Sequence, residues 1–206
     1  VFMPHLPRRQ LFVLGLGLTV IASPLAAQET MRVRGEIERR DGAAYIVKTR
    51  DGATVRVVLA DTPIFVAMVK ASMADIKPGM FVGATAMPGH GDSLRAVEVH
   101  IFPEAMRGAG EGHRPWDLKP QSTMTNANVD TIVTGVDSHT LTMKYKDGEK
   151  KLEVTPETVV VTYAPGDAAE VGPGTKIFIS AAQKQADGSL KTPRITYGKD
   201  GLTPPM

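Results

Sequence analysis

The chain has 206 residues, of which 42% are hydrophobic and 22% charged, an ordinary globular composition that allows one large or two small domains. Its 24 basic and 22 acidic side chains give a formal charge of +2, and the excess comes from Arg8 and Arg9, since no acidic residue precedes Glu29. The chain contains no cysteine, which excludes disulfides, thiolate nucleophiles and zinc–thiolate clusters. No region clusters Lys and Arg as a nucleic-acid surface requires, so we expect no nucleic-acid partner.

The first 27 residues have the pattern of a secretory signal peptide. Arg8 and Arg9 precede the apolar run 11–22, and small residues follow up to Ala27. The run is too short to cross a bilayer as a stable helix. We therefore expect cleavage after Ala27, export by the general secretory route rather than the twin-arginine route, and a periplasmic protein with no membrane span.

Beyond residue 28 the sequence reads as two copies of one strand-rich unit. Placing Asp51-Gly52 over Asp147-Gly148 brings the apolar positions of both halves into step, with Ile37 over Val133. A Pro-Gly pair and a Ser-Leu-basic motif then recur in the same order in both halves. The expected organisation is a signal peptide at 1–27, a first barrel at 29–105, a linker at 106–128, a second barrel at 129–198 and a C-terminal tail at 199–206.

Apolar and polar side chains alternate within each unit, which is the pattern of strands with one buried face. In the second unit, Leu141, Met143 and Tyr145 alternate with threonine and lysine. Each Asp-Gly pair favours a type I′ hairpin turn, whose twist matches the flanking strands. Further strands are expected at Met31–Glu38, Tyr45–Thr49, Thr54–Leu59, Met80–Met87, Leu94–Phe102, Asn128–Val136, Lys176–Ala182 and Leu190–Tyr197.

An alanine-rich connection precedes the fourth strand of each unit, at Ala67–Lys77 and at Tyr163–Gly172. The first is long enough for a short helix, which the following Pro-Gly would end. Five short strands with one such connection indicate a small OB-like barrel, whose closure removes exposed sheet edges. We therefore predict an all-β fold of two tandem five-stranded barrels joined by a linker containing Gly, Pro and Trp. Tyr45 and Tyr145 fall on the apolar side of their strands, so we expect them in the cores.

Part of this pattern resembles a known family. The residues that carry the resemblance are Val33-Arg-Gly-Glu-Ile37, Asp51-Gly52, Asp75-Ile-Lys-Pro-Gly79 and Asp92-Ser-Leu-Arg-Ala-Val-Glu-Val99. They resemble a widespread exported bacterial OB-like domain that is classed as a domain of unknown function, over Met31–Phe102 closely and Asn128–Tyr197 more loosely. The whole chain is similar to proteobacterial proteins that carry the label of metal-transporter permeases. No segment after residue 28 is apolar over the length of a membrane span, so we do not expect a permease. The resemblance implies no catalytic residue.

The linker carries the candidate binding residues. Its glycines give flexibility, whereas Arg114-Pro115-Trp116 places a rigid step and the only tryptophan in its middle. One interpretation is that Trp116 and Leu118 fold back as a plug between the barrels. The other is that Arg107, His113, Arg114 and Trp116 bind a ligand or partner at the mouth between them.

Metal binding and catalysis have weaker support. Met87, His90, Met106 and His113 offer thioether and imidazole ligands of the kind that copper accepts, but Met is also a common core filler. Asp137-Ser138-His139 contains triad residue types, yet neighbours in a turn point in different directions, and no hydrolase or phosphate-binding motif is present.

We therefore expect no catalytic residue, no metal and no cofactor. The favoured function is a non-enzymatic periplasmic accessory protein that binds an envelope protein or a small ligand in the crevice between the barrels. A copper-binding protein is the alternative, and a hydrolase is a third, weaker one.

Overall fold

The computed structural model describes residues 29–136 and 138–206. The expected signal peptide and Asp137 lie outside the described residues. The regular structure is almost entirely β, which confirms the predicted fold class, and the only helical pieces among the described residues are three short 3-10 turns. None of the helical segments that the structure describes has the length and apolarity to cross a membrane.

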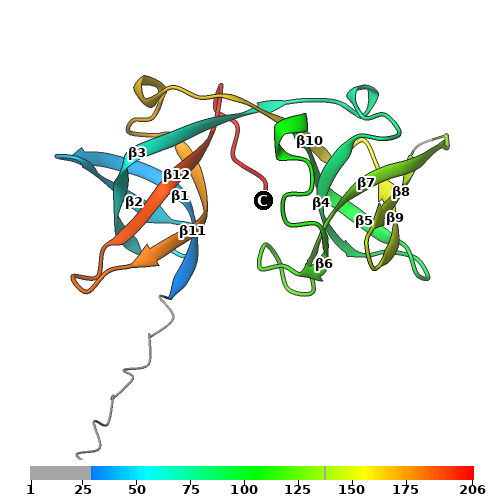
Figure 1. Cartoon of the computed structure of the whole chain (residues 1–206), viewed down its shortest axis with the longest axis horizontal. Coiled ribbons are helices and arrows are strands. Elements are labelled where there is room, and N and C mark those ends of the chain that lie inside the picture. Colours follow the sequence, from blue (N-terminus) through cyan, green and yellow to red (C-terminus); the bar gives the residue numbers. More distant parts are fainter. Residues whose placement is uncertain (1–28, 137) are drawn as a thin grey trace, which may run out of the picture.

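Twelve strands follow one another along the described chain (Figure 1). They are β1 (Thr30–Asp41), β2 (Ala44–Thr49), β3 (Thr54–Lys70), β4 (Phe81–Pro88), β5 (Leu94–Ile101), β6 (Gly112–Pro115), β7 (Thr123–Thr134), β8 (His139–Tyr145), β9 (Gly148–Val154), β10 (Val159–Pro165), β11 (Lys176–Lys184) and β12 (Leu190–Gly198). The 3-10 turns are η1 (Met73–Asp75), η2 (Glu104–Met106) and η3 (Ala168–Glu170). The short helix expected in the first connection is therefore only the single turn η1.

The first barrel is a closed ring of five strands in the order β1-β2-β3-β12-β11. All neighbours are antiparallel except β3 and β12, which run parallel and close the ring. Its interior is lined by apolar side chains at alternate positions, and Tyr45 is fully buried among them, as expected. The predicted five-stranded barrel is thus confirmed.

The second ring has the order β7-β8-β9-β5-β4 and also closes through a parallel pair, in which Leu94 lies opposite Leu152. Leu141 and Met143 are fully buried in its core, and Tyr145 packs against that core from a partly buried position. The alternation in the second hairpin therefore predicted correctly which side chains face inward.

The barrels exchange strands, which the sequence did not predict. β1 to β3, from the first half of the chain, form a ring with β11 and β12 from the second half. β7 to β9, from the second half, form the other ring with β4 and β5 from the first half. The expected barrel boundaries, 29–105 and 129–198, are wrong for this reason. β3 does not end near Leu59 but continues to Lys70, which carries the chain from one barrel to the other.

The crossing point lies between the barrels, where β3 and β10 pair antiparallel with Met68 opposite Tyr163 (Figure 1). β10 also pairs with β5 in parallel, as the same part of β3 pairs with β12. The two rings therefore belong to one continuous sheet, and the pairing of β3 with β10 joins them.

The strand register corrects the alignment of the two halves. A β-bulge follows Ile37 where β1 pairs with β2, and a β-bulge follows Val129 where β7 pairs with β8. Ile37 therefore corresponds to Val129 and not to Val133. The expected type I′ turns are also wrong, because that type needs positive φ at both central residues, whereas at Asp51-Gly52 only Gly52 has it.

Candidate functional site

A small apolar cluster fills the space between the barrels. Met68, Val161, Phe178 and Met206 are its buried members, and Trp116 packs against it from a partly buried position. Trp116 therefore lies between the barrels, as the interpretation of a plug requires.

The expected C-terminal tail takes part in this cluster. Met206 is 4% exposed, and its sulfur lies 3.3 Å from the Tyr163 hydroxyl. Its backbone oxygen accepts a 2.5 Å hydrogen bond from Nε of Arg34. The tail thus holds the side of the first barrel that faces Trp116, a role that the sequence analysis missed.

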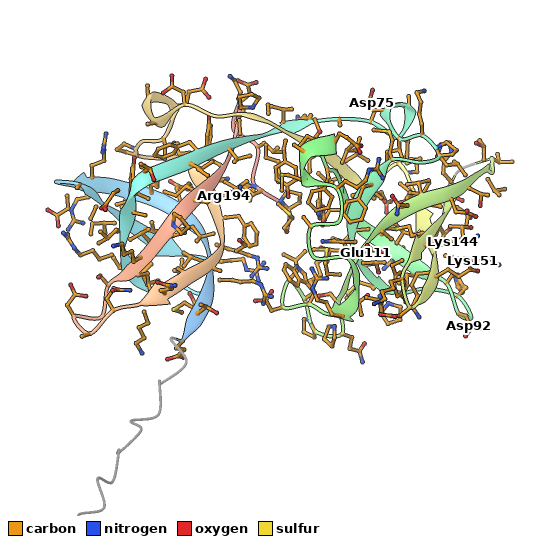
Figure 2. All side chains as sticks on the ribbon, viewed as in Figure 1. Asp75, Asp92, Glu111, Lys144, Lys151 and Arg194 are labelled. Carbon is orange, nitrogen blue, oxygen red and sulfur yellow. The ribbon has the colours of Figure 1, made fainter. Side chains whose placement is uncertain are left out.

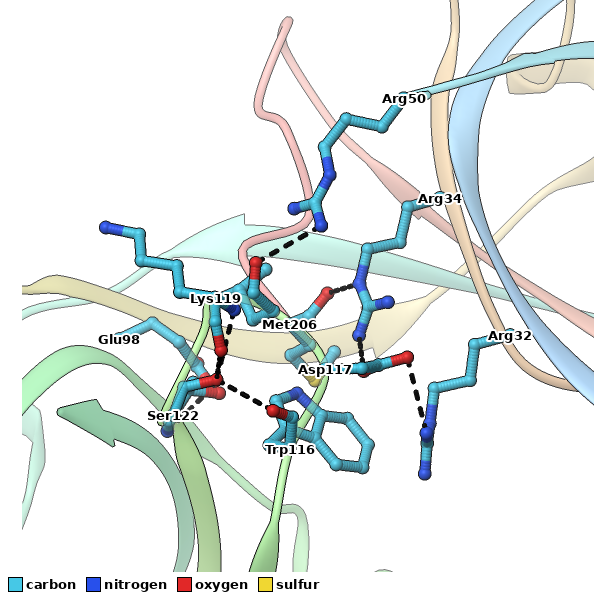
Figure 3. Close-up of polar contacts among 11 residues, drawn as sticks. Arg32, Arg34, Arg50, Glu98, Trp116, Asp117, Lys119, Ser122 and Met206 are labelled. Carbon is cyan, nitrogen blue, oxygen red and sulfur yellow. Dashed lines mark hydrogen bonds and ion pairs between the residues drawn. The ribbon is translucent and has the colours of Figure 1, made fainter. Parts of the chain in front are cut away.

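Guanidinium groups surround Trp116. Arg32 lies 4.0 Å from the centroid of the indole ring, Arg114 5.6 Å and Arg34 5.8 Å. Cations over an aromatic face are attracted by the negative potential of the ring. Arg50 joins them from the end of β2, where its Nη2 donates to the backbone oxygen of Leu118 at 3.2 Å (Figure 3). We call Arg32, Arg34, Arg50, Arg114 and Trp116 the arginine–tryptophan surface.

One carboxylate already binds this surface. Asp117 accepts a hydrogen bond from Nη2 of Arg34 at 2.8 Å and pairs with Arg32 at 3.4 Å (Figure 3). The hydrogen bond from Arg34, followed by the charges of Arg34 and Arg32, holds the pKa of Asp117 below its usual value. Burial and the nearby charge of Arg32 lower the pKa of Arg114. Asp117 therefore pairs with two of the four guanidinium groups of this surface, and the surface keeps an excess of positive charge.

A tight turn after β6 fixes the position of Trp116. The backbone N–H of Trp116 donates to the Ser122 oxygen at 2.8 Å, and the Ser122 hydroxyl donates to the Trp116 oxygen at 2.9 Å (Figure 3). Gln121 adopts φ of 65°, which lets the chain reverse here. The turn aims the indole at the first barrel, although its Nε1 is buried without a hydrogen-bond partner.

A groove of about 620 Å³ adjoins this surface on the first barrel. Arg34, Arg50 and Leu118 line it together with residues of the barrel and the tail, which include Lys48, Lys176, Glu36, Glu38, Ile177, Thr203 and Pro204. Its lining combines charged side chains with apolar ones, and it includes Arg34 and Arg50 of the arginine–tryptophan surface. Its volume is within the range typical of small-molecule sites.

The structure brings together two of the four predicted site residues, Arg114 and Trp116. His113 lies on the other face of β6, since side chains alternate along a strand, and its Nδ1 contacts the Thr125 hydroxyl at 2.8 Å. Burial, with Lys150 and Arg114 nearby, lowers the pKa of His113.

Arg107, the fourth predicted site residue, binds Glu104, the Asn128 side chain at 2.5 Å and the Gly79 oxygen. These contacts join η2 to the second barrel. Arg32, Arg34 and Arg50 were missed because strand alternation does not tell which outward faces meet.

A buried polar pair lies on the outer face of β5. Glu98 and His100 are 0% and 2% exposed, and His100 Nδ1 lies 3.1 Å from the Glu98 carboxylate. Thr85 donates to the same carboxylate through its backbone N–H at 3.1 Å and its hydroxyl at 2.7 Å. Burial and then the charge of Glu98 raise the pKa of Tyr163 beside them. These contacts satisfy the carboxylate internally, which is the arrangement of a structural pair.

The lysine-rich second hairpin does not belong to this region. Lys144 and Lys151 lie on the side of the second barrel that faces away from the first (Figure 2), and Lys144 pairs with Asp130 at 3.1 Å. Among residues 29–136 and 138–206, no three His, Cys, Asp or Glu side chains gather as metal ligands. The copper-binding alternative, which also uses methionine, stays a prediction, and the Asp137 of the Asp-Ser-His sequence is outside the described residues.

Searches among models of known protein families, curated proteins and solved structures found no match to this chain.

Proposed function

We propose that this chain is a non-enzymatic binding protein of the bacterial periplasm, which captures an acidic group of an envelope protein at the arginine–tryptophan surface. The observation that supports this most is the Trp116 ring under three guanidinium groups, of which Asp117 pairs with two. Tryptophan and arginine are the side chains most enriched among residues that dominate binding energy.

The choice of an acidic group follows from geometry and charge. The planar guanidinium binds carboxylates through paired hydrogen bonds, and Asp117 shows how a carboxylate fits between Arg32 and Arg34. Arg50 and Arg114 have no carboxylate within salt-bridge distance in the described part of the chain. A partner that presents two or more carboxylates therefore gains pairs that Asp117 alone does not satisfy.

The periplasmic location is part of the proposal and is supported by the residues before Glu29. Arg8 and Arg9, the apolar run 11–22 and the small residues up to Ala27 have the pattern of a secretory signal. The absence of cysteine fits an oxidising compartment, because no free thiol is exposed to it.

The test uses Trp116 itself, which is the only tryptophan of the chain and so reports on this surface alone. The purified protein is titrated with hexaglutamate and, for comparison, with hexalysine, while the tryptophan fluorescence is recorded. We expect saturable quenching by hexaglutamate that weakens as salt rises, because exposed ion pairs are screened, and no response to hexalysine.

Variants give the control. Replacing Arg34→Gln should weaken hexaglutamate binding about tenfold, since a charge-assisted hydrogen bond is worth roughly 1.5 kcal/mol. Arg39→Gln, on the exposed part of β1 away from Trp116, should bind like the original protein. If hexaglutamate leaves the fluorescence unchanged, or if both variants bind alike, the proposed function is wrong.

A further inference from the structure

β6 covers the beginning of β7 as an added strand. It pairs antiparallel with β7, from Gly112 opposite Asn126 to Pro115 opposite Thr123. Beneath it, Met124, Thr125 and Asn126 are 2%, 1% and 5% exposed. A short extended segment therefore satisfies and buries a strand edge of the second barrel that its five-stranded ring leaves free.

The corresponding edge of the first barrel is β1 at Thr30–Arg34. The bulges place Ile37 at the position of Val129, so this segment corresponds to Ser122–Asn126. Pairing with the neighbouring strands agrees, because Glu36 lies opposite Lys176 and the corresponding Asn128 lies opposite Phe81.

This edge of β1 carries no added strand within residues 29–136 and 138–206. β1 pairs with β2 only from Gly35 onward, and one further bond joins the Arg50 N–H to the Arg34 oxygen at 2.9 Å. Consistent with an uncovered edge, Met31 is 43% exposed and the Arg32 side chain 37%. Unpaired N–H and C=O groups of such an edge are a template for another strand.

The side chains along this edge define what fits. Arg32 and Arg34 lie on one face of β1 because side chains alternate, and both belong to the arginine–tryptophan surface. Met31 lies on the opposite face. A strand beside β1 therefore meets cations on one face and an apolar side chain on the other, which matches alternating acidic and apolar residues.

We propose that an extended acidic segment of a partner protein pairs antiparallel with β1 along Thr30–Arg34, in the position that β6 has on β7. Its carboxylates bind Arg32 and Arg34 in competition with Asp117, and its apolar side chains cover Met31. This proposal rests on the proposed function, since it specifies the form in which the partner presents its carboxylates.

The test compares two peptides of equal charge, Ac-(Glu-Val)4-NH2 and the same peptide with alternate backbone nitrogens methylated on the edge that pairs with β1. N-methylation removes the donors needed for strand pairing but keeps every carboxylate. We expect the parent peptide to quench Trp116, to slow hydrogen exchange of the Arg32 amide at least tenfold in NMR spectra, and to bind about tenfold more tightly than the methylated one.

Protein variants and the site of protection complete the design. Arg32→Gln should weaken the binding of the parent peptide, whereas Arg39→Gln should leave this binding unchanged. If both peptides quench Trp116 equally and the exchange of β1 amides is unchanged, strand pairing is wrong while the proposed function stands. Slower hydrogen exchange of β7 amides in place of β1 amides would also contradict strand pairing on β1, because the peptide would then have displaced β6. If neither this peptide nor hexaglutamate affects Trp116, the proposed function fails as well.

Discussion

Gly83 lies on the outer face of β4 in the second barrel, where the packing leaves no room for a side chain. A Cβ at this position would lie 2.0 Å from His100 Nε2 and 2.6 Å from Asn126 Oδ1, and both side chains are buried. His100 is held in place by Glu98 on the same strand, and edge-on by Phe102 at 4.7 Å between ring centroids. The ring therefore has nowhere to move without breaking these contacts.

We predict that Gly83→Ala lowers the free energy of unfolding by about 1 to 3 kcal/mol, the usual cost of overpacking a well-packed interior. Thermal unfolding followed by circular dichroism measures the loss. Gly172→Ala is the matched control, because no heavy atom lies within 4 Å of its added Cβ and its φ is not in the left-handed region. Equal stability of the two variants would show that His100 is not fixed as the structure has it.

At the level of elements, the tail after β12 behaves as part of the fold. The chain turns sharply at Lys199–Leu202, where Gly198 approaches the Leu202 oxygen so closely that an added Cβ would lie 1.6 Å from it. The turn returns the chain toward the cluster between the barrels, where Met206 contacts Tyr163 and Arg34.

Met206→Ala should therefore destabilise the protein by about 2 kcal/mol, since truncating a buried methionine removes its transfer free energy and leaves a cavity. Met31→Ala serves as the control, because a side chain that is 43% exposed contributes little, within about 0.5 kcal/mol. Urea unfolding of both variants gives the comparison. A loss at position 31 as large as at position 206 would contradict the role assigned to the tail.

The elements that sequence predicted best are the hairpins. Alternation alone placed Leu141 and Met143 inward, because a strand with one wet face has to turn its apolar side chains toward the core. The extension of β3 was missed because Asp61-Thr62-Pro63 reads as a strand end. In the structure β12 shifts register between Thr192 and Arg194 where it passes these residues, and such irregularities accommodate proline.

β6 was missed for a related reason. Its four residues include Gly112 and Pro115, both poor strand formers, and they form a strand only because β7 offers a free edge. Trp116 and Arg114 were identified by residue type, whereas Arg32, Arg34 and Arg50 look like ordinary outward positions in sequence. These arginines contact the linker because of the way the outer face of the first barrel meets it. Local periodicity predicts which side chains point outward, but it does not predict which outer face contacts the linker.

For the whole molecule, the exchange of strands means that neither half contains a complete barrel. β1 to β3 need β11 and β12, and β7 to β9 need β4 and β5. A short sheet without its closing strands exposes its edges and its apolar face. The sequence could not reveal this, because the alternation predicts five strands in each half, and a contiguous barrel of those five strands satisfies the same pattern.

A cut in the linker tests this organisation. We expect that a specific protease site inserted at Gly108, in the exposed turn between η2 and β6, is cleaved without separating the two fragments, since every closed ring takes strands from both. Size-exclusion chromatography of the cut protein should show one species of the original size. After separation in urea, each fragment alone should be unfolded or self-associated by circular dichroism and chromatography, because it lacks two strands of one ring and three strands of the other. Mixing the fragments should restore the original species. Two fragments that elute separately as folded monomers would instead mean that each half forms its own barrel in solution, and the exchange of β4 and β5 for β11 and β12 would be wrong.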